Sequence, residues 1–143
     1  MTVHIFTKRT NRPSQTSPRQ GVAAAEFAVC LPVIILLILG MIESCSMIFL
    51  KQSLTVASYE GVRAALEESA VATDVHRTSQ QVLTDRRVQG SIVSIDPVDF
   101  ENLVPGEYIS VTITAPADSN SVIPGNFYRA RTLSATATMM KEF

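Results

Sequence analysis

Apolar residues are concentrated in one long run near the start of the chain. Residues 27–42, "FAVCLPVIILLILGMI", carry no charge, and after Glu43 a second uncharged run continues to Lys51. A transmembrane helix needs about 20 mostly apolar residues, so the first run reaches full length only with its flanks. Pro32 within it is tolerated in a membrane, where neighbours or water can satisfy the freed backbone groups. We therefore predict a transmembrane segment over residues 22–50.

The apolar spacing after this segment predicts that the same helix continues into water. Leu50, Leu54 and Ala57 recur at helical intervals, which favours one helix over residues 22–69. Gly61 is a local weakness in it, worth about 1 kcal/mol relative to alanine. A helix of this length is longer than a bilayer is thick, so its second half must pack on something outside the membrane.

The next segment, "DVHRTSQQVLTDRRV" at residues 74–88, predicts a second helix. Thr73 or Asp74 is expected to cap its amino terminus, and Gly90 follows its end. The apolar positions within this segment are few, so the face that it buries is expected to be narrow.

Three later segments have the pattern of β-strands: "SIVSIDP" at 91–97, "EYISVTITAP" at 107–116 and "RTLSATATMM" at 131–140. The middle one alternates most clearly, which predicts one apolar face and one hydroxyl-rich face. The predicted fold class is therefore α+β: a long amino-terminal membrane helix, a second helix, and a small antiparallel sheet of about three strands. The expected organisation is a basic leader at 1–21, the membrane segment at 22–50 and an extracytoplasmic domain at 51–143.

Charge is distributed unevenly along the chain. Residues 1–21 carry four basic residues and no acid, whereas the rest carries eight basic and 13 acidic residues. An acidic body argues against a nucleic-acid partner. The positive-inside rule places the leader in the cytoplasm and the body on the opposite side of the membrane. An ordinary signal peptide is disfavoured, because the apolar run exceeds the usual length and the small residues 23–25 precede it.

A short motif lies where the leader meets the apolar run. Gly21 ends the basic leader, Glu26 is the fifth residue after it, and Phe27 opens the uncharged run. This arrangement resembles the class III signal peptide of the type IV pilin superfamily. Together with "QSLTVASYEGVRAAL" and the closing "RTLSATATMMKEF", the sequence resembles the TadE-like minor pseudopilins of tight-adherence (Flp) pilus systems.

The resemblance implies that a prepilin peptidase cuts after Gly21 and that the mature protein begins at Val22. Glycine allows a protease to approach the backbone closely. A carboxylate in lipid costs at least about 2.5 kcal/mol, so the persistence of Glu26 suggests a partner. In pilin-like assemblies the implied partner is the new α-amino group of Val22, on the same or a neighbouring subunit. Other pilin-like subunits, the pilus assembly machinery and the membrane are the remaining partners.

Glu43 is a second acid associated with the apolar segment. It is interpreted as a residue at the outer boundary of the membrane, with a polar contact in an assembly seam as the alternative. Cys30 and Cys45 would be roughly 22 Å apart on one helix, too far to form a disulfide within the chain. They are interpreted as apolar filler, with a disulfide between chains as the alternative.

Catalytic and metal-binding motifs are not evident in the sequence, so we expect no enzyme activity, cofactor or metal. His76 stands alone on a polar helix. Asp96, Asp99, Glu101 and Glu107 form an acidic loop without the spacing of a calcium site. The Arg86–Arg87 pair is interpreted as surface charge rather than as a phosphate site.

These expectations define a single-pass protein of the bacterial inner membrane that assists assembly of a Tad/Flp pilus for adhesion or biofilm formation. Whether the subunit enters the fibre is left open. An uncleaved adaptor of a secretion complex is the first alternative, and an anchored enzyme or ligand-binding domain is the second. Cleavage at Gly21 distinguishes the first alternative from the leading hypothesis.

Overall fold

The computed structural model describes residues 19–123, 128 and 130–142. It contains a helix α1 (Arg19–Ala65), a helix α2 (Ala72–Asp85) and three strands, β1 (Ile92–Asp96), β2 (Tyr108–Pro116) and β3 (Thr132–Met140). Two short 3₁₀ turns lie at Phe100–Asn102 and Asp118–Asn120. The chain divides into two compact units, residues 1–36 and residues 37–143.

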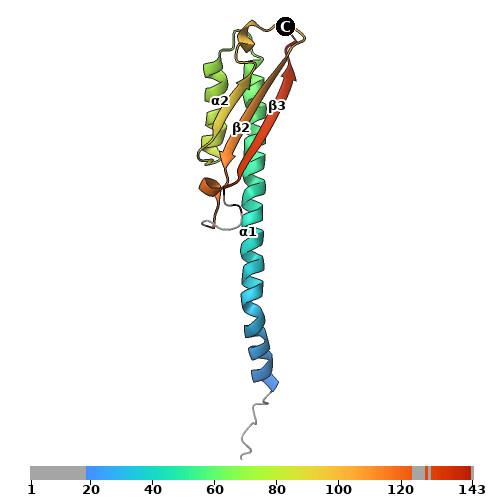
Figure 1. The fold of residues 1–143 in the computed structure, drawn as a ribbon, viewed down its shortest axis with the longest axis vertical. Coiled ribbons are helices and arrows are strands. Elements are labelled where there is room, and N and C mark those ends of the chain that lie inside the picture. Colours follow the sequence, from blue (N-terminus) through green and yellow to red (C-terminus); the bar gives the residue numbers. More distant parts are fainter. Residues whose placement is uncertain (1–18, 124–127, 129, 143) are drawn as a thin grey trace, which may run out of the picture. The chain divides into compact units, whose positions relative to one another are not determined.

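The second unit is a small α+β body in which the strands form one antiparallel sheet in the order β1-β2-β3 (Figure 1). The register pairs Ile95 with Val111 across the first ladder and Val111 with Ala137 across the second. This confirms the predicted fold class and places every predicted strand within one or two residues of its observed bounds. The clear alternation explains this accuracy, because a strand shifted by one residue would turn its apolar side chains to solvent.

One face of the sheet supplies the core of the body. The alternate residues of β2 are buried on that face, and the two helices cover them with their own apolar side chains. The fully buried members with the largest side chains are Phe100, Leu54, Leu83, Ile109, Ile113 and Val62. Burial of a large aliphatic side chain contributes about 1.5–3 kcal/mol, so this cluster is the main source of stability of the body.

The opposite face of the sheet carries hydroxyl side chains. The hydroxyl oxygens of Ser110 on β2 and Thr138 on β3 lie 2.8 Å apart, and so do those of Thr112 and Thr136. Such cross-strand hydroxyl pairs each contribute roughly 0.2–1 kcal/mol. The predicted division of β2 into an apolar face and a hydroxyl-rich face is confirmed.

The helix boundaries differ in part from those expected. α1 ends at Ala65 rather than near residue 69, and Ser69 has a positive φ of 65°. The continuous α-helix therefore ends about one turn earlier than its apolar spacing indicated.

The predicted cap of the second helix was wrong, because α2 begins at Ala72 and so includes Thr73 and Asp74 in its first turn. The residue at the N-cap position is Val71, which offers no side-chain hydrogen bond. Instead, the carboxylate of Glu101 accepts a hydrogen bond of 3.2 Å from the backbone N–H of Ala72. A distant carboxylate thus satisfies one of the free donors at the helix start and complements its dipole.

Candidate functional site

Gly21 lies in the first turn of α1, two residues after the helix begins at Arg19. That turn contains no acidic residue, and a Cβ atom added at Gly21 would meet nothing within 4 Å. Glycine within a helix destabilises it by about 1 kcal/mol relative to alanine. The peptide bond between Gly21 and Val22 therefore lies in a helical turn of low intrinsic stability. Unfolding this turn costs little free energy.

The motif residues after Gly21 are exposed. Val22 is 58% exposed and Phe27 is 60% exposed, and Glu26 is exposed as well. Glu26 follows Val22 by four residues, so both lie on one face of the helix, one turn apart. Within the described residues Glu26 has no ion-pair partner. Its carboxylate is free to meet a cation presented on that face.

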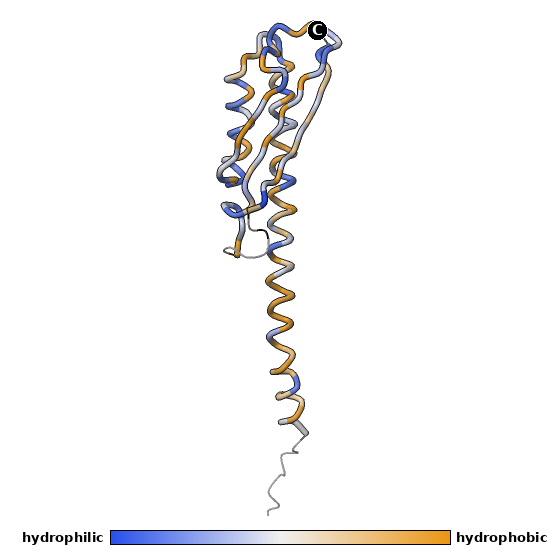
Figure 2. The backbone as a smooth tube through the Cα atoms, in the orientation of Figure 1, coloured by the Kyte–Doolittle hydropathy of each residue, from blue (hydrophilic) through white to orange (hydrophobic). Residues whose placement is uncertain are grey.

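The residues that follow the motif, up to residue 36, are equally exposed. All side chains from residue 21 to residue 36 are exposed, including Val29 at 78% and Leu36 at 62%. Figure 2 shows that the half of α1 nearer the N-terminus is coloured mostly as hydrophobic. Its most apolar window has a mean hydropathy of 2.7, and none of that window is buried. An apolar helix that its own chain leaves uncovered is suited to a bilayer or to neighbouring helices. Pro32 lies inside this helix without ending it.

Glu43 has a different environment from Glu26. It is only 2% exposed, within the body of residues 37–143. The hydroxyl of Ser121 donates to its Oε1 atom at 2.5 Å, and the backbone N–H of Ile123 donates to its Oε2 atom at 3.3 Å. Glu43 therefore fastens the connection between β2 and β3 to α1. Sequence reasoning did not foresee this contact, because the partners are about 80 residues away along the chain.

A second contact joins the same connection to α1. Ser44 donates to the carbonyl of Gly40 at 2.8 Å, and the hydroxyl of Tyr128 lies 3.4 Å from Ser44 Oγ. Because the Ser44 proton is used within the helix, Tyr128 is the donor to Ser44. Two neighbouring residues of α1 thus bind the connection.

Two of the acidic loop residues form structural hydrogen bonds. Glu101 caps α2, Glu107 accepts a hydrogen bond from the backbone N–H of Val104, and His76 is exposed on α2. In the part of the chain that the structure describes, no three His, Cys, Asp or Glu residues cluster as metal ligands would. Cys30 and Cys45 are exposed free thiols.

The comparison with known families bears on the segment that holds this motif. Residues 21–63 match the model of the TadE-like protein family. This segment, which is less than half of the chain, is therefore similar to the TadE-like family. The match begins at Gly21 itself and includes Val22, Glu26, Phe27 and Glu43. No curated protein and no solved structure matches the chain.

The similarity is confined to residues 21–63, which include most of α1. The exposed apolar stretch of α1 fits a single-pass membrane protein. The TadE-like match ends at Arg63, so the sheet and α2 lie outside the matched segment.

Proposed function

We propose that this TadE-like subunit is cut by a prepilin peptidase after Gly21 and then acts in assembly of a Tad/Flp pilus that serves adhesion or biofilm formation. The supporting observation is that the family match begins at Gly21, directly after a leader that has four basic residues and no acid. In this proposal the protein resides in the bacterial cytoplasmic membrane, with the leader in the cytoplasm and the body outside it.

The role proposed for Glu26 follows from its position. Cleavage would create a charged α-amino group on Val22, one helical turn from the Glu26 carboxylate and on the same face. Pairing with that amine, in the same subunit or a neighbouring one, would offset the cost of placing a carboxylate in lipid. A pair between neighbours would also set the register of one subunit on the next.

The test is the intact mass of the membrane-extracted protein, expressed with its cognate peptidase, together with peptide mapping of its amino terminus. A mature start at Val22 is the expected result. Gly21→Ala is expected to block processing, whereas Gly40→Ala is the matched control. A Cβ at either glycine meets nothing within 4 Å, so neither variant disturbs packing.

A second arm tests the carboxylate. Glu26→Gln is expected to leave cleavage intact but to abolish piliation, whereas Glu60→Gln on the second half of α1 should preserve both. A start at Met1 or Thr2 in the wild type would replace the proposal with the uncleaved adaptor. Normal piliation by Glu26→Gln would remove the pairing role while leaving the cleavage site in place.

A further inference from the structure

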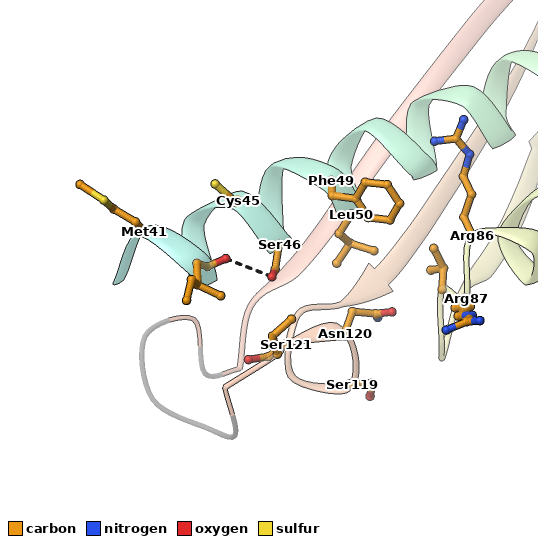
Figure 3. Close-up of a pocket in the computed structure, with 13 residues that line it drawn as sticks. Met41, Cys45, Ser46, Phe49, Leu50, Arg86, Arg87, Ser119, Asn120 and Ser121 are labelled. Carbon is orange, nitrogen blue, oxygen red and sulfur yellow. Dashed lines mark hydrogen bonds between the residues drawn. The ribbon is translucent and has the colours of Figure 1, made fainter. Parts of the chain in front are cut away.

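A pocket of about 610 Å³ lies in the body of residues 37–143, beside the part of α1 that directly follows the most apolar stretch (Figure 3). One wall is α1, and the other is formed by the residues after α2 and by the connection after β2. The apolar lining is contributed by Met41, Ile42, Cys45, Phe49, Val88 and Val122. The α1 wall is therefore mostly apolar, whereas the opposite wall carries polar groups beside Val88 and Val122.

Two adjacent arginines, Arg86 and Arg87, also line this pocket. Within the described residues neither forms an ion pair, whereas Arg63 and Arg77 each pair with a carboxylate three residues earlier. Unpaired guanidinium groups beside an apolar surface favour a ligand with a phosphate or carboxylate. The pocket therefore combines an apolar surface with a site for an anion.

The end of α2 holds Arg87 in a conformation that glycine would adopt more easily. Its φ is 57°, and the turn is closed by hydrogen bonds from Arg87 N to Thr84 O at 2.9 Å and from Val88 N to Leu83 O at 2.8 Å. A side chain is disfavoured at this position, where glycine is the usual residue. An arginine at this position therefore carries a backbone cost that glycine would avoid.

Hydrogen bonds also fix the wall that faces α1. The side chain of Asn120 donates to the carbonyls of Gln89 and Pro116 and accepts from the N–H of Gln89, at distances of 2.8–2.9 Å. Glu43 holds the neighbouring Ser121. The wall is therefore set by the fold before any ligand arrives, which lowers the cost of ordering it on binding.

We propose that this pocket holds one anionic phospholipid, with its acyl chain on the α1 lining and its phosphate on Arg86 and Arg87. In a single-pass membrane protein, the residues that follow the apolar stretch are at the level of the lipid headgroups. The lining residues Met41 and Ile42 are the last two of the uncharged run 27–42, so an acyl chain can follow uncharged side chains from that run to the pocket. The proposal does not depend on cleavage at Gly21.

The test uses the full-length protein at one chain per nanodisc. The chain contains no tryptophan, so Phe49→Trp supplies a single fluorophore in the pocket. Brominated phosphatidylglycerol should quench this fluorescence more than brominated phosphatidylcholine at equal mole fraction, because two arginines near anionic headgroups should enrich the anionic lipid by about 30-fold. Leu36→Trp, which reports on the exposed stretch, should be quenched equally by both lipids.

Matched variants show whether Arg86 and Arg87 cause the preference for phosphatidylglycerol over phosphatidylcholine. Changing both Arg86 and Arg87 to Gln in the Phe49→Trp protein should abolish it, whereas changing both Arg63 and Arg77 to Gln should not. Hydrogen exchange of the body confirms that each variant is folded. Native mass spectrometry of the unmodified chain, in which phosphatidylglycerol should be retained over phosphatidylcholine, does not depend on the tryptophan.

Three results would overturn the proposal. Equal quenching by the two lipids, together with equal retention by the unmodified chain, would show that no headgroup is selected. A preference that survives loss of Arg86 and Arg87 would place the lipid elsewhere. The same protein can also be prepared at two or more chains per disc. If the pocket residues are protected from hydrogen exchange only in those discs, the occupant is a neighbouring subunit.

Discussion

Two stretches of α1, each with a majority of apolar residues, have opposite environments. In the first, residues 21–36, every side chain is exposed. In the second, residues 47–65, Leu54, Ala57 and Val62 are completely buried in the body. An apolar side chain on α1 is therefore not always covered by the rest of the chain, even though both stretches belong to the same helix.

The difference between the stretches lies in the arrangement of their residues. The first is apolar on nearly all sides, with Glu26 as its single charge. The second alternates buried apolar positions with exposed polar ones such as Gln52, Thr55 and Arg63, as does a helix that packs on one face. The first must find its apolar surroundings outside the chain, in lipid or in other subunits, whereas the second finds them in its own sheet.

The largest expected effect tests this contrast directly. Leu54→Ala removes a fully buried side chain and leaves a cavity, so it should lower the free energy of unfolding of the body by about 2–5 kcal/mol. Leu36→Ala, in the exposed stretch, should leave that free energy unchanged. Denaturant unfolding in detergent, followed by circular dichroism, measures both. Comparable losses in the two variants would contradict the view that only the second stretch belongs to the core.

Substitutions at Gly61 and Gly40 test the same comparison, with a smaller expected change in the free energy of unfolding. A Cβ at Gly61 would lie 2.3 Å from Ser79 Oγ and 3.1 Å from a methyl of Val111, whereas one at Gly40 meets open space. Gly61→Ala should therefore destabilise the body by about 1–3 kcal/mol through overpacking, despite the higher helix propensity of alanine. Gly40→Ala should be neutral or slightly stabilising.

A second substitution isolates the cause. Ser79 Oγ is buried and has no hydrogen-bond partner among the described residues, so Ser79→Ala alone should cost little. In the Gly61→Ala background it should restore most of the lost stability, as measured by a double-mutant cycle of unfolding free energies. Additive losses would show that the two helices do not depend on this close approach.

Gly61 also shows what sequence reasoning could and could not reach. Its sequence context suggested only a weak point in a helix, because the partner Ser79 belongs to another element. The strands were located well, since alternation such as that of Ile109, Val111 and Ile113 is a local signal. Contacts between distant segments leave no such local signal.

The site shows the same limit. Gly21, Glu26 and Phe27 could be selected because their spacing lies within one short motif. The partners of Glu43 at Ser121 and Ile123, and the cap that Glu101 provides for α2, depend on how the body folds. The Arg86–Arg87 pair was interpreted as surface charge, because the sequence does not show that α1 provides an apolar wall beside it.

The smallest expected effect concerns Glu43, which lies between the two stretches of α1. Glu43→Ala removes the acceptor for Ser121 and for the backbone N–H of Ile123. Hydrogen bonds to a charged group contribute about 1.5–3 kcal/mol, but the variant also avoids burying a carboxylate. The net loss of stability should therefore be about 1 kcal/mol.

The effect should also be local, because these hydrogen bonds hold one connection and not the apolar core. Amide hydrogen exchange should accelerate at residues 119–123, whereas β2 and the second stretch of α1 keep their protection. Glu60→Ala is the control, since Glu60 is a more exposed carboxylate on the same helix. Unchanged exchange at residues 119–123 would contradict the role of Glu43 in holding this connection. Uniform acceleration throughout the body would show instead that Glu43 stabilises the whole core.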